Sequence, residues 1–230
     1  MEGHIVRTFD GEILNLRLRA LQMGGYALDQ VQRAVQALAD SDPEAAGNVI
    51  AKHDQVVDYA RGIEEETVAL IARRQPVASD LTMILSVARV ATDLERVGNA
   101  ARKIARIAIQ LTAAAEDMPP PRFYHDVRRM ARIATGMLRE ALDCYDRLDV
   151  ARAASVVGKD AEVDAELQLA LRELLTFVME DPRRIGDMIH TVFALKAIER
   201  VGDHARNIAG LVSRLASREQ LEAPPAGVSG

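Results

Sequence analysis

Two pairs of aspartates have the spacing that puts both carboxylates on one face of a helix. Asp54 and Asp58 form the first pair, and Asp160 and Asp164 repeat it 106 residues later in the chain. Residues four positions apart lie about one helical turn from each other. Like charges so placed repel by roughly a few tenths of a kcal/mol unless a cation compensates them. We therefore expect a cation beside each pair, either an arginine or a metal ion.

A longer motif repeats at almost the same interval. Residues 95–105 match residues 199–209 at 8 of 11 positions, and Pro76 recurs as Pro182. Both copies of the motif follow their aspartate pair in the same order along the chain. Two ordered pairs of similar segments indicate a duplicated unit.

The chemistry of the first unit has two interpretations. Asp54, Asp58 and Glu95 would come from neighbouring helices and would offer only hard oxygen donors, which suit Mg, Mn, Ca or Fe better than Zn. One interpretation is a cluster of metal ions. The other is a solvated helix face whose carboxylates pair with arginine. The spacing alone leaves both open.

The helices that must position these residues can be placed from the hydrophobic pattern. Apolar residues recur at helical spacing through nearly the whole chain, and no sustained alternation indicates a strand. The predicted fold is all-α, with two tandem, sequence-related three-helix bundles. Three consecutive prolines at 119–121 cannot continue a helix and mark the boundary between the bundles. The six long helices are expected at 8–40, 43–74, 77–115, 122–149, 151–180 and 181–218.

The domain limits follow from this boundary. Residues 1–117 are predicted to form the first bundle and residues 118–220 the second, with a disordered tail at 221–230. Gly24 and Gly25 lie inside the first helix, where each costs about 1 kcal/mol relative to alanine. The pair predicts close helix packing at this point, with a kink as the alternative.

Composition narrows the class of function. The formal net charge of −5 and an isoelectric point near 5.6 argue against nucleic acid as the principal partner. A single cysteine, Cys144, and a start without a basic and apolar leader predict a reducing cytoplasm. No apolar run approaches the roughly 18 residues of a membrane helix. We therefore expect membrane contact only through a partner protein.

These features resemble the PhoU family, the cytoplasmic regulators of bacterial phosphate uptake and phosphate-starvation signalling. The resemblance covers nearly the whole chain. Members of the family have two similar three-helix bundles side by side, and their acidic motifs hold clusters of metal ions such as iron or zinc. The resemblance is strongest at residues 74–81, 93–99, 172–182 and 198–209.

Carried over by position, the resemblance implies two sets of metal ligands. The first set is Asp54, Asp58, Glu95 and Asn99, and the second is Asp160, Asp164, Glu199 and Asp203. The first set departs from the family because Asn99 stands where an aspartate is usual. An amide keeps an oxygen donor but loses the charge, so the first site is expected to bind metal more weakly than the second.

The resemblance also implies partners and cofactors. Family members restrain the phosphate regulon through contacts with the ATPase of the phosphate ABC transporter and with the phosphate-sensing histidine kinase. They often form homodimers. We expect the same partners here, with Fe, Zn, Mn or Mg as the metal ion, and a regulatory function by binding.

Two other functions remain as alternatives. One is a purely structural helical adaptor whose acidic stripes pair only with arginine. The other is a carboxylate-bridged metalloenzyme, which would normally need Glu-x-x-His pairs aimed into a bundle, and the sequence has none. Asp187 and His190 have a related spacing, but His190 lies among apolar residues and is interpreted as a core histidine. His204 follows Asp203 directly and should point elsewhere, because a helix turns about 100° per residue. An enzyme is not expected.

Overall fold

The computed structural model describes residues 2–76, 78–114 and 121–222, and the regular structure in these ranges is entirely helical. The predicted all-α class is confirmed. None of the described helices combines the length and the apolar character needed to cross a bilayer. The elements in chain order are α1 (Glu2–Ala39), α2 (Pro43–Ala51), α3 (His53–Arg74), α4 (Ala78–Ala114), α5 (Pro121–Arg147), α6 (Val150–Gly158), α7 (Asp160–Glu180), the 3₁₀-helix η1 (Pro182–Arg184) and α8 (Ile185–Glu222).

Two of the six predicted long helices are each divided by one residue. The helix expected at 43–74 breaks at Lys52 into α2 and α3, and the helix expected at 151–180 breaks at Lys159 into α6 and α7. Neither break carries proline, and only the second follows a glycine, Gly158. Each of these two predicted helices is therefore found as two helices in line, and only the break at Lys159 has a helix-disfavouring residue, Gly158, beside it.

The ends of the units agree with the prediction less completely. The sixth helix opens with the short η1 before α8 begins. Because α8 runs to Glu222, the first two residues of the predicted tail are helical, and the rest of that tail lies outside the described residues. The predicted boundary between residues 117 and 118 also lies outside them.

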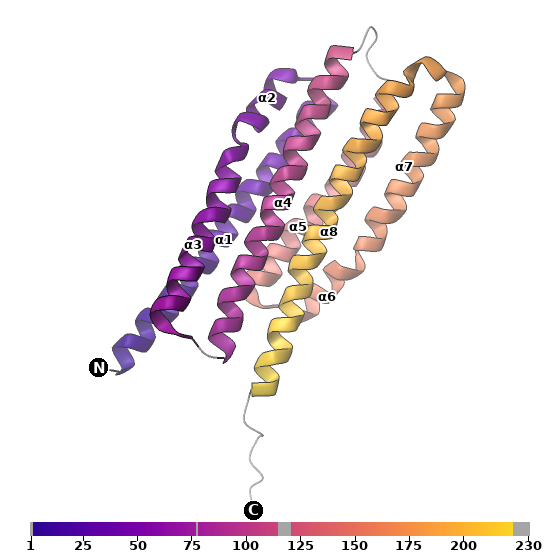
Figure 1. The fold of residues 1–230 in the computed structure, drawn as a ribbon. Coiled ribbons are helices and arrows are strands. Elements are labelled where there is room, and N and C mark those ends of the chain that lie inside the picture. Colours follow the sequence, from indigo (N-terminus) through magenta and orange to yellow (C-terminus); the bar gives the residue numbers. More distant parts are fainter. Residues whose placement is uncertain (1, 77, 115–120, 223–230) are drawn as a thin grey trace, which may run out of the picture.

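The helices form two three-helix units that lie side by side and share one core. Figure 1 shows α4 and α8 next to each other and running in opposite directions, with α2 and α3 on one side and α6 and α7 on the other. Helices α1 and α5 also contact each other, so four long helices join the two units. One continuous cluster of buried apolar residues extends through both halves. The prediction of two related bundles is confirmed.

Small residues let the two units approach closely. An ideal Cβ added at Gly24 of α1 would lie 2.6 Å from Cδ2 of Leu142 on α5. The helix continues without interruption through this position. The predicted close packing is therefore found at Gly24, where a larger side chain would meet Leu142. Nothing lies within 4 Å of a Cβ added at Gly25.

A buried polar junction fixes α1, α4 and α5 against one another. The ring of Tyr145 on α5 is fully buried, and its hydroxyl lies 3.2 Å from Oγ of Ser86 on α4. The Arg17 guanidinium of α1 lies over the Tyr145 ring, 5.6 Å from its centroid, and donates to the backbone carbonyls of Tyr145 and Asp146 at 3.1 and 2.9 Å. Buried hydroxyls need such partners, so this junction specifies how the two units meet.

When the two units are compared, the residues of α3 and α7 that occupy equivalent positions are not the ones that the aspartate pairs suggest. Val56 packs against Gly98 in the first unit, and Val163 packs against Gly202 in the second. These two valines are 107 residues apart, whereas the matching aspartates are 106 apart. Since α3 has 22 residues and α7 has 21, the missing residue lies at the end of α7, after the buried positions. His53, and not Asp54, therefore occupies the position equivalent to Asp160.

The same two glycines provide a matched test of this packing. A Cβ at Gly98 would lie 2.7 Å from Cγ1 of Val56, but one at Gly202 would lie 3.4 Å from Cγ2 of Val163. Because valine is stiff, Gly98→Ala should lower the free energy of unfolding by about 1–3 kcal/mol. Gly202→Ala should raise it by about 0.5–1 kcal/mol through helix propensity. Urea unfolding of both variants measures this difference, and equal midpoints would contradict it.

Candidate functional site

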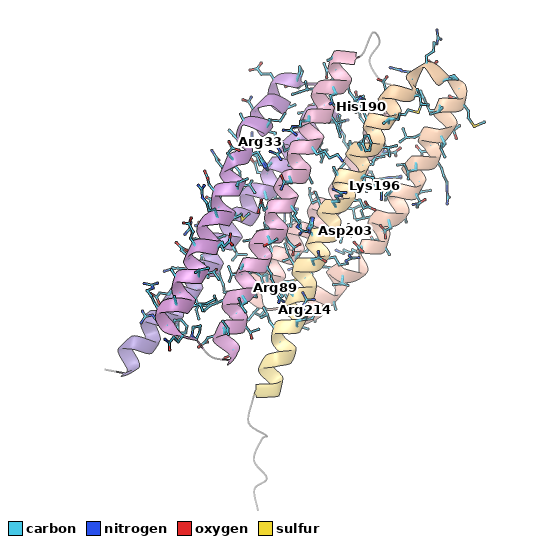
Figure 2. All side chains as sticks on the ribbon, in the orientation of Figure 1. Arg33, Arg89, His190, Lys196, Asp203 and Arg214 are labelled. Atoms are coloured by element: carbon cyan, nitrogen blue, oxygen red, sulfur yellow. The ribbon has the colours of Figure 1, made fainter. Side chains whose placement is uncertain are left out.

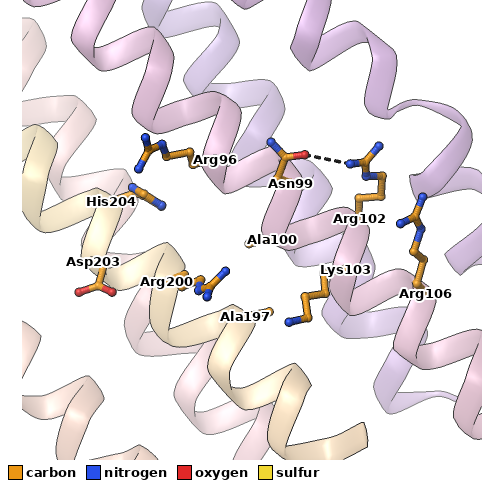
Figure 3. A pocket seen from close by; sticks show the side chains of 10 residues that line it. All are labelled: Arg96, Asn99, Ala100, Arg102, Lys103, Arg106, Ala197, Arg200, Asp203 and His204. Carbon is orange, nitrogen blue, oxygen red and sulfur yellow. Dashed lines mark hydrogen bonds between the residues drawn. The ribbon is translucent and has the colours of Figure 1, made fainter.

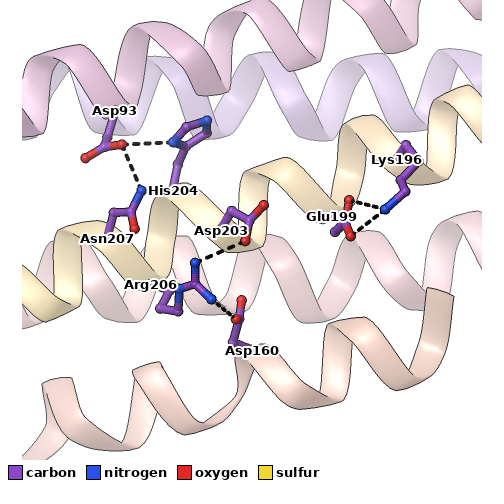
Figure 4. Close-up of polar contacts among 8 residues, drawn as sticks. All are labelled: Asp93, Asp160, Lys196, Glu199, Asp203, His204, Arg206 and Asn207. Carbon is purple, nitrogen blue, oxygen red and sulfur yellow. Dashed lines mark hydrogen bonds and ion pairs between the residues drawn. The ribbon is translucent and has the colours of Figure 1, made fainter. Parts of the chain in front are cut away.

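The second acidic set is compensated by basic side chains. Arg206 on α8 forms ion pairs with Asp160 on α7 and with Asp203 one turn away, the latter at 3.4 Å (Figure 4). Glu199 accepts from Nζ of Lys196 at 2.7 Å. Figure 2 shows Asp203 and Lys196 along the middle of α8. Three of the four predicted ligands of this unit thus lie along one stretch of α7 and α8, each with a cation beside it.

Asp164, the fourth predicted ligand of this set, is not part of that network. Its side chain is exposed on α7, one turn beyond Asp160. The ion pairs around Arg206 involve Asp160 and Asp203 alone. The structure therefore places Asp164 outside the group that shares one guanidinium.

The first acidic set is more dispersed. Asp54 is exposed, and Asp58 is exposed with an ion pair to Arg61 at 2.6 Å. Asn99 accepts from the Arg102 guanidinium at 3.1 Å. The half-buried Glu95 lies one turn before Asn99 on α4. The outward direction of the two aspartates follows from the one-residue shift of register described above.

A histidine takes the place of a carboxylate in the first unit. His53 is 4% exposed and lies near the backbone of Gly98 and the side chain of Arg102. Arg102 and Arg206 are equivalent in the repeat, so Arg206 meets two carboxylates where Arg102 meets an amide and an imidazole. The first unit therefore carries less negative charge at the position where the second has its cluster.

The fit of these residues to a metal ion was tested against this geometry. Their oxygen donors have the right chemistry for a hard cation. Among the residues that the structure describes, however, no three His, Cys, Asp or Glu side chains gather in positions that could hold one. The carboxylates are instead paired with arginine and lysine, as in the salt-bridged interpretation of the spacing. Metal binding by the eight candidates stays a prediction.

The second set is nevertheless short of positive charge. Burial raises the pKa of Asp203; the Arg206 guanidinium opposes that change, and the neighbouring carboxylates of Asp160 and Glu199 raise the pKa further. One guanidinium, that of Arg206, thus serves the two carboxylates of Asp160 and Asp203. This is the electrostatic condition under which an additional cation would be stabilised.

A polar contact between the two units was missed in the sequence. Nδ1 of His204 on α8 lies 2.8 Å from Oδ1 of Asp93 on α4, and Asn207 donates to the same oxygen at 3.3 Å (Figure 4). His204 therefore points away from the acidic set, as its helical position predicted. A signal for this contact was present, because His204 within the repeated motif and Asp93 two residues before it differ from their counterparts Ala100 and Ala197.

A groove of about 720 Å³ lies between α4 and α8 beside this contact, with His204 in its lining (Figure 3). Two alanines, Ala100 and Ala197, are buried at its floor. Its single carboxylate is Asp203, which is paired with Arg206. The lining is strongly basic for an acidic protein. Its cationic residues are Arg96, Arg102, Lys103, Arg106 and Arg200.

Comparison with known proteins identifies the family. The model of the PhoU domain matches residues 20–108 and, a second time, residues 127–212. The chain belongs to the PhoU family. Its relatives include the phosphate-specific transport system accessory protein PhoU homologs of Pseudomonas aeruginosa and Rhizobium meliloti. The first is 46% identical over 209 residues, which cover 91% of this chain and 85% of that protein. The second is 40% identical over 218 residues, which cover 95% and 91%.

Solved PhoU structures have the same fold. The crystal structure of PhoU from Pseudomonas aeruginosa superposes with a TM-score of 0.86 at 45% identity, over 91% of this chain and 99% of that one. PhoU from Streptococcus pneumoniae gives a TM-score of 0.83 at 25% identity, over 91% and 97%. The resemblance seen in the motifs is thus confirmed over both units.

The buried His53 should make the stability of this PhoU-family protein depend on pH. Burial and the charge of Arg102 lower its pKa from 6.5, against weaker opposing effects of Asp54, Glu95 and the Gly98 backbone. The folded state favours the neutral imidazole, so stability is full above pH 6.5 and is lost as the pH falls through the lowered pKa.

We expect the melting temperature to drop on acidification below pH 6.5, and His53→Gln to make that part of the profile flatter. His125, which is exposed, provides the matched control as His125→Gln. Thermal melts across this range measure both variants. An unchanged profile in His53→Gln would show that another group is responsible.

Proposed function

We propose that this protein is a negative regulator of phosphate uptake and of the phosphate-starvation regulon, and that it acts by binding other proteins. The observation that carries the proposal is the match of a PhoU domain to both units, together with relatives named accessory proteins of the phosphate-specific transport system. The proposed partners are the ATPase of the phosphate ABC transporter and the phosphate-sensing histidine kinase. A homodimer in the cytoplasm belongs to the same proposal.

The shape of the molecule supports a function by contact. Long parallel and antiparallel helices present extended faces. The hollow between α4 and α8 is an open groove and not an enclosed cavity. Asp187, which has the spacing of a bundle metal ligand with His190, is paired with Arg184 at 3.4 Å. These features favour a regulator over the metalloenzyme alternative.

A candidate contact surface lies at the end of the second unit. Four large apolar side chains are exposed within 15 residues around the turn from α7 to α8, at the end of α8 where Figure 2 labels His190. Met179 is 83% exposed, and none of the other three is less than 49% exposed. Concentrated apolar exposure in a soluble domain marks an interaction site. The other three residues are Leu175, Ile185 and Ile189.

Deletion of the gene tests the regulatory function directly. In the native host grown with excess phosphate, alkaline phosphatase activity should rise several-fold on deletion, and the wild-type gene should restore repression. Met179→Glu should restore it poorly, because a charge would be buried against the partner. Leu14→Glu, a change at a 52% exposed leucine of the first unit, is the matched control and should restore it fully. Unchanged phosphatase activity in the deletion strain would contradict the proposal.

Metal binding at the second acidic set is part of this proposal. The cation would replace Arg206 beside Asp160 and Asp203, so Arg206→Ala should bind metal about tenfold more tightly than the wild type. Glu199→Ala with Asp203→Ala should lose the metal. Elemental analysis for Fe, Zn, Mn and Mg after purification, followed by Mn²⁺ titration, measures both effects.

The corresponding change in the first set is the control for this experiment. Glu95→Ala with Asn99→Ala should reduce metal content less, because Asn99 contributes no charge. If metal content is the same in the wild type and in the Glu199→Ala, Asp203→Ala variant, the assignment of the site is wrong. A metal-free wild type that still represses phosphatase would favour the structural adaptor.

A further inference from the structure

The basic groove lies at one of two equivalent positions along the contact between α4 and α8, and this position has no polar pair. The repeat relates α4 to α8 by 104 residues, so the contact between Asp93 and His204 has a counterpart between Ala197 and Ala100. At the first position a carboxylate and an imidazole meet. At the second, both residues are buried alanines, and both line the groove.

The replacement leaves a lysine without its expected carboxylate. Asn207 bonds Asp93 at 3.3 Å, and its counterpart is Lys103. The repeat therefore places Ala197 opposite Lys103 in the position that Asp93 has opposite Asn207. Its ammonium instead lies over the ring of Phe193, 5.1 Å from the centroid. A lysine that faces a missing carboxylate is a ready partner for an anion from solution.

Three arginines add to this unbalanced charge. Arg96 and Arg200 occupy equivalent positions in the two units, and both line the groove (Figure 3). Within the part of the chain that the structure describes, neither they nor Arg106 form an ion pair with a carboxylate. Apart from Arg102, which bonds the Asn99 amide, the groove thus holds four cations, including Lys103, that form no ion pair with an acidic side chain of the described residues.

The size and lining of the groove limit the class of anion. Two phosphoryl groups, each with a charge of about −1.5 to −2, would balance four cations. A volume of about 720 Å³ lies within the range of small-ligand sites, which is roughly 300–1,000 Å³, and exceeds what a single phosphate would fill. Apart from His204 the lining has no ring on which a nucleobase could stack. Guanidinium groups match the oxygens of phosphate with two bonds each.

We propose that the groove between α4 and α8 binds a small anion that carries two or more phosphoryl groups, held by Arg96, Lys103 and Arg200. The anion takes the place that the Asp93 carboxylate occupies at the equivalent contact. Because it lies against both units at once, it also reinforces their contact. The groove borders the acidic set around Arg206 through Asp203, so the anion is tested with divalent metal removed.

Calorimetric titration of the full chain with inorganic tripolyphosphate, in buffer with EDTA, tests the site. Tripolyphosphate should bind at least about tenfold more tightly than orthophosphate, because it reaches more of the cations. Arg96→Ala with Arg200→Ala should weaken its binding by about tenfold or more. Arg172→Ala also removes one positive charge, but from the exposed face of α7, and should change the affinity for tripolyphosphate by less than about twofold.

Ala197→Asp provides the sharpest variant. It restores the carboxylate that Asp93 supplies at the equivalent position, so it should pair with Lys103 and abolish tripolyphosphate binding. Lys103→Ala changes an exposed side chain and should also weaken tripolyphosphate binding. It replaces Ala197→Asp in the test if that variant does not fold.

Three results would overturn the proposal. Arg96→Ala with Arg200→Ala could bind as the wild type does, or Arg172→Ala could lose as much affinity as the groove variants. The wild type could also bind an acidic glutamate peptide more tightly than tripolyphosphate, which would assign the groove to an acidic protein partner.

Discussion

The antiparallel contact of α4 with α8 is the constraint on which the arrangement of charge in this protein depends. Each helix carries an apolar stripe that is buried in the shared core, and this burial fixes the rotation of the helix about its axis. The direction in which the neighbouring polar stripe points is then fixed as well. In α4 that stripe holds Asn99 and Arg102, and in α8 it holds Asp203 and Arg206. The acidic sets and the basic groove are both consequences of this rotation.

Internal cations explain how the acidic stripes coexist with a stable fold. Carboxylates one turn apart on a helix repel, and a partly buried one such as Asp203 is further penalised by desolvation. Arg206 reduces both costs by lying between Asp160 and Asp203. In this network two carboxylates share one guanidinium.

Duplication followed by divergence gives the two units different chemistry on one frame. Their packing is conserved closely enough that Gly98 and Gly202 each meet a valine of the neighbouring helix. Their charged positions differ, because His53 stands where the second unit has Asp160. At the contact between units, the pair of Asp93 and His204 in one copy of the repeat corresponds to a pair of alanines in the other. A symmetric frame thus carries a closed polar contact on one side and an open basic groove on the other.

Much of the fold could be predicted from the sequence because its determinants are local. Helical periodicity, the prolines at 119–121 and the repeated motif were sufficient for the all-α class and for two related three-helix units. The start of α2 is likewise local, because the Asp42 side chain accepts from the backbone amides of Glu44 and Ala45 and Pro43 is the first helical residue. The break at Lys52 could not be predicted, since no residue there disfavours a helix by itself, and Gly158 before Lys159 is only a weak signal because glycine also occurs inside α1 and α4.

The candidate site was only partly contained in the sequence. Spacing placed the carboxylates on helix faces and predicted a cation beside each aspartate pair. Arg206 is that cation for Asp160, which it links to Asp203, while Asp164 lies outside this network. The sequence by itself therefore determined the residue types, their periodicity and the duplication, which depend on neighbours along the chain. Only the tertiary structure decided that His53 replaces Asp54 in the packing register and that two alanines open a basic groove. Those outcomes depend on which helices meet and at what rotation, and burial of both units in one core sets that rotation.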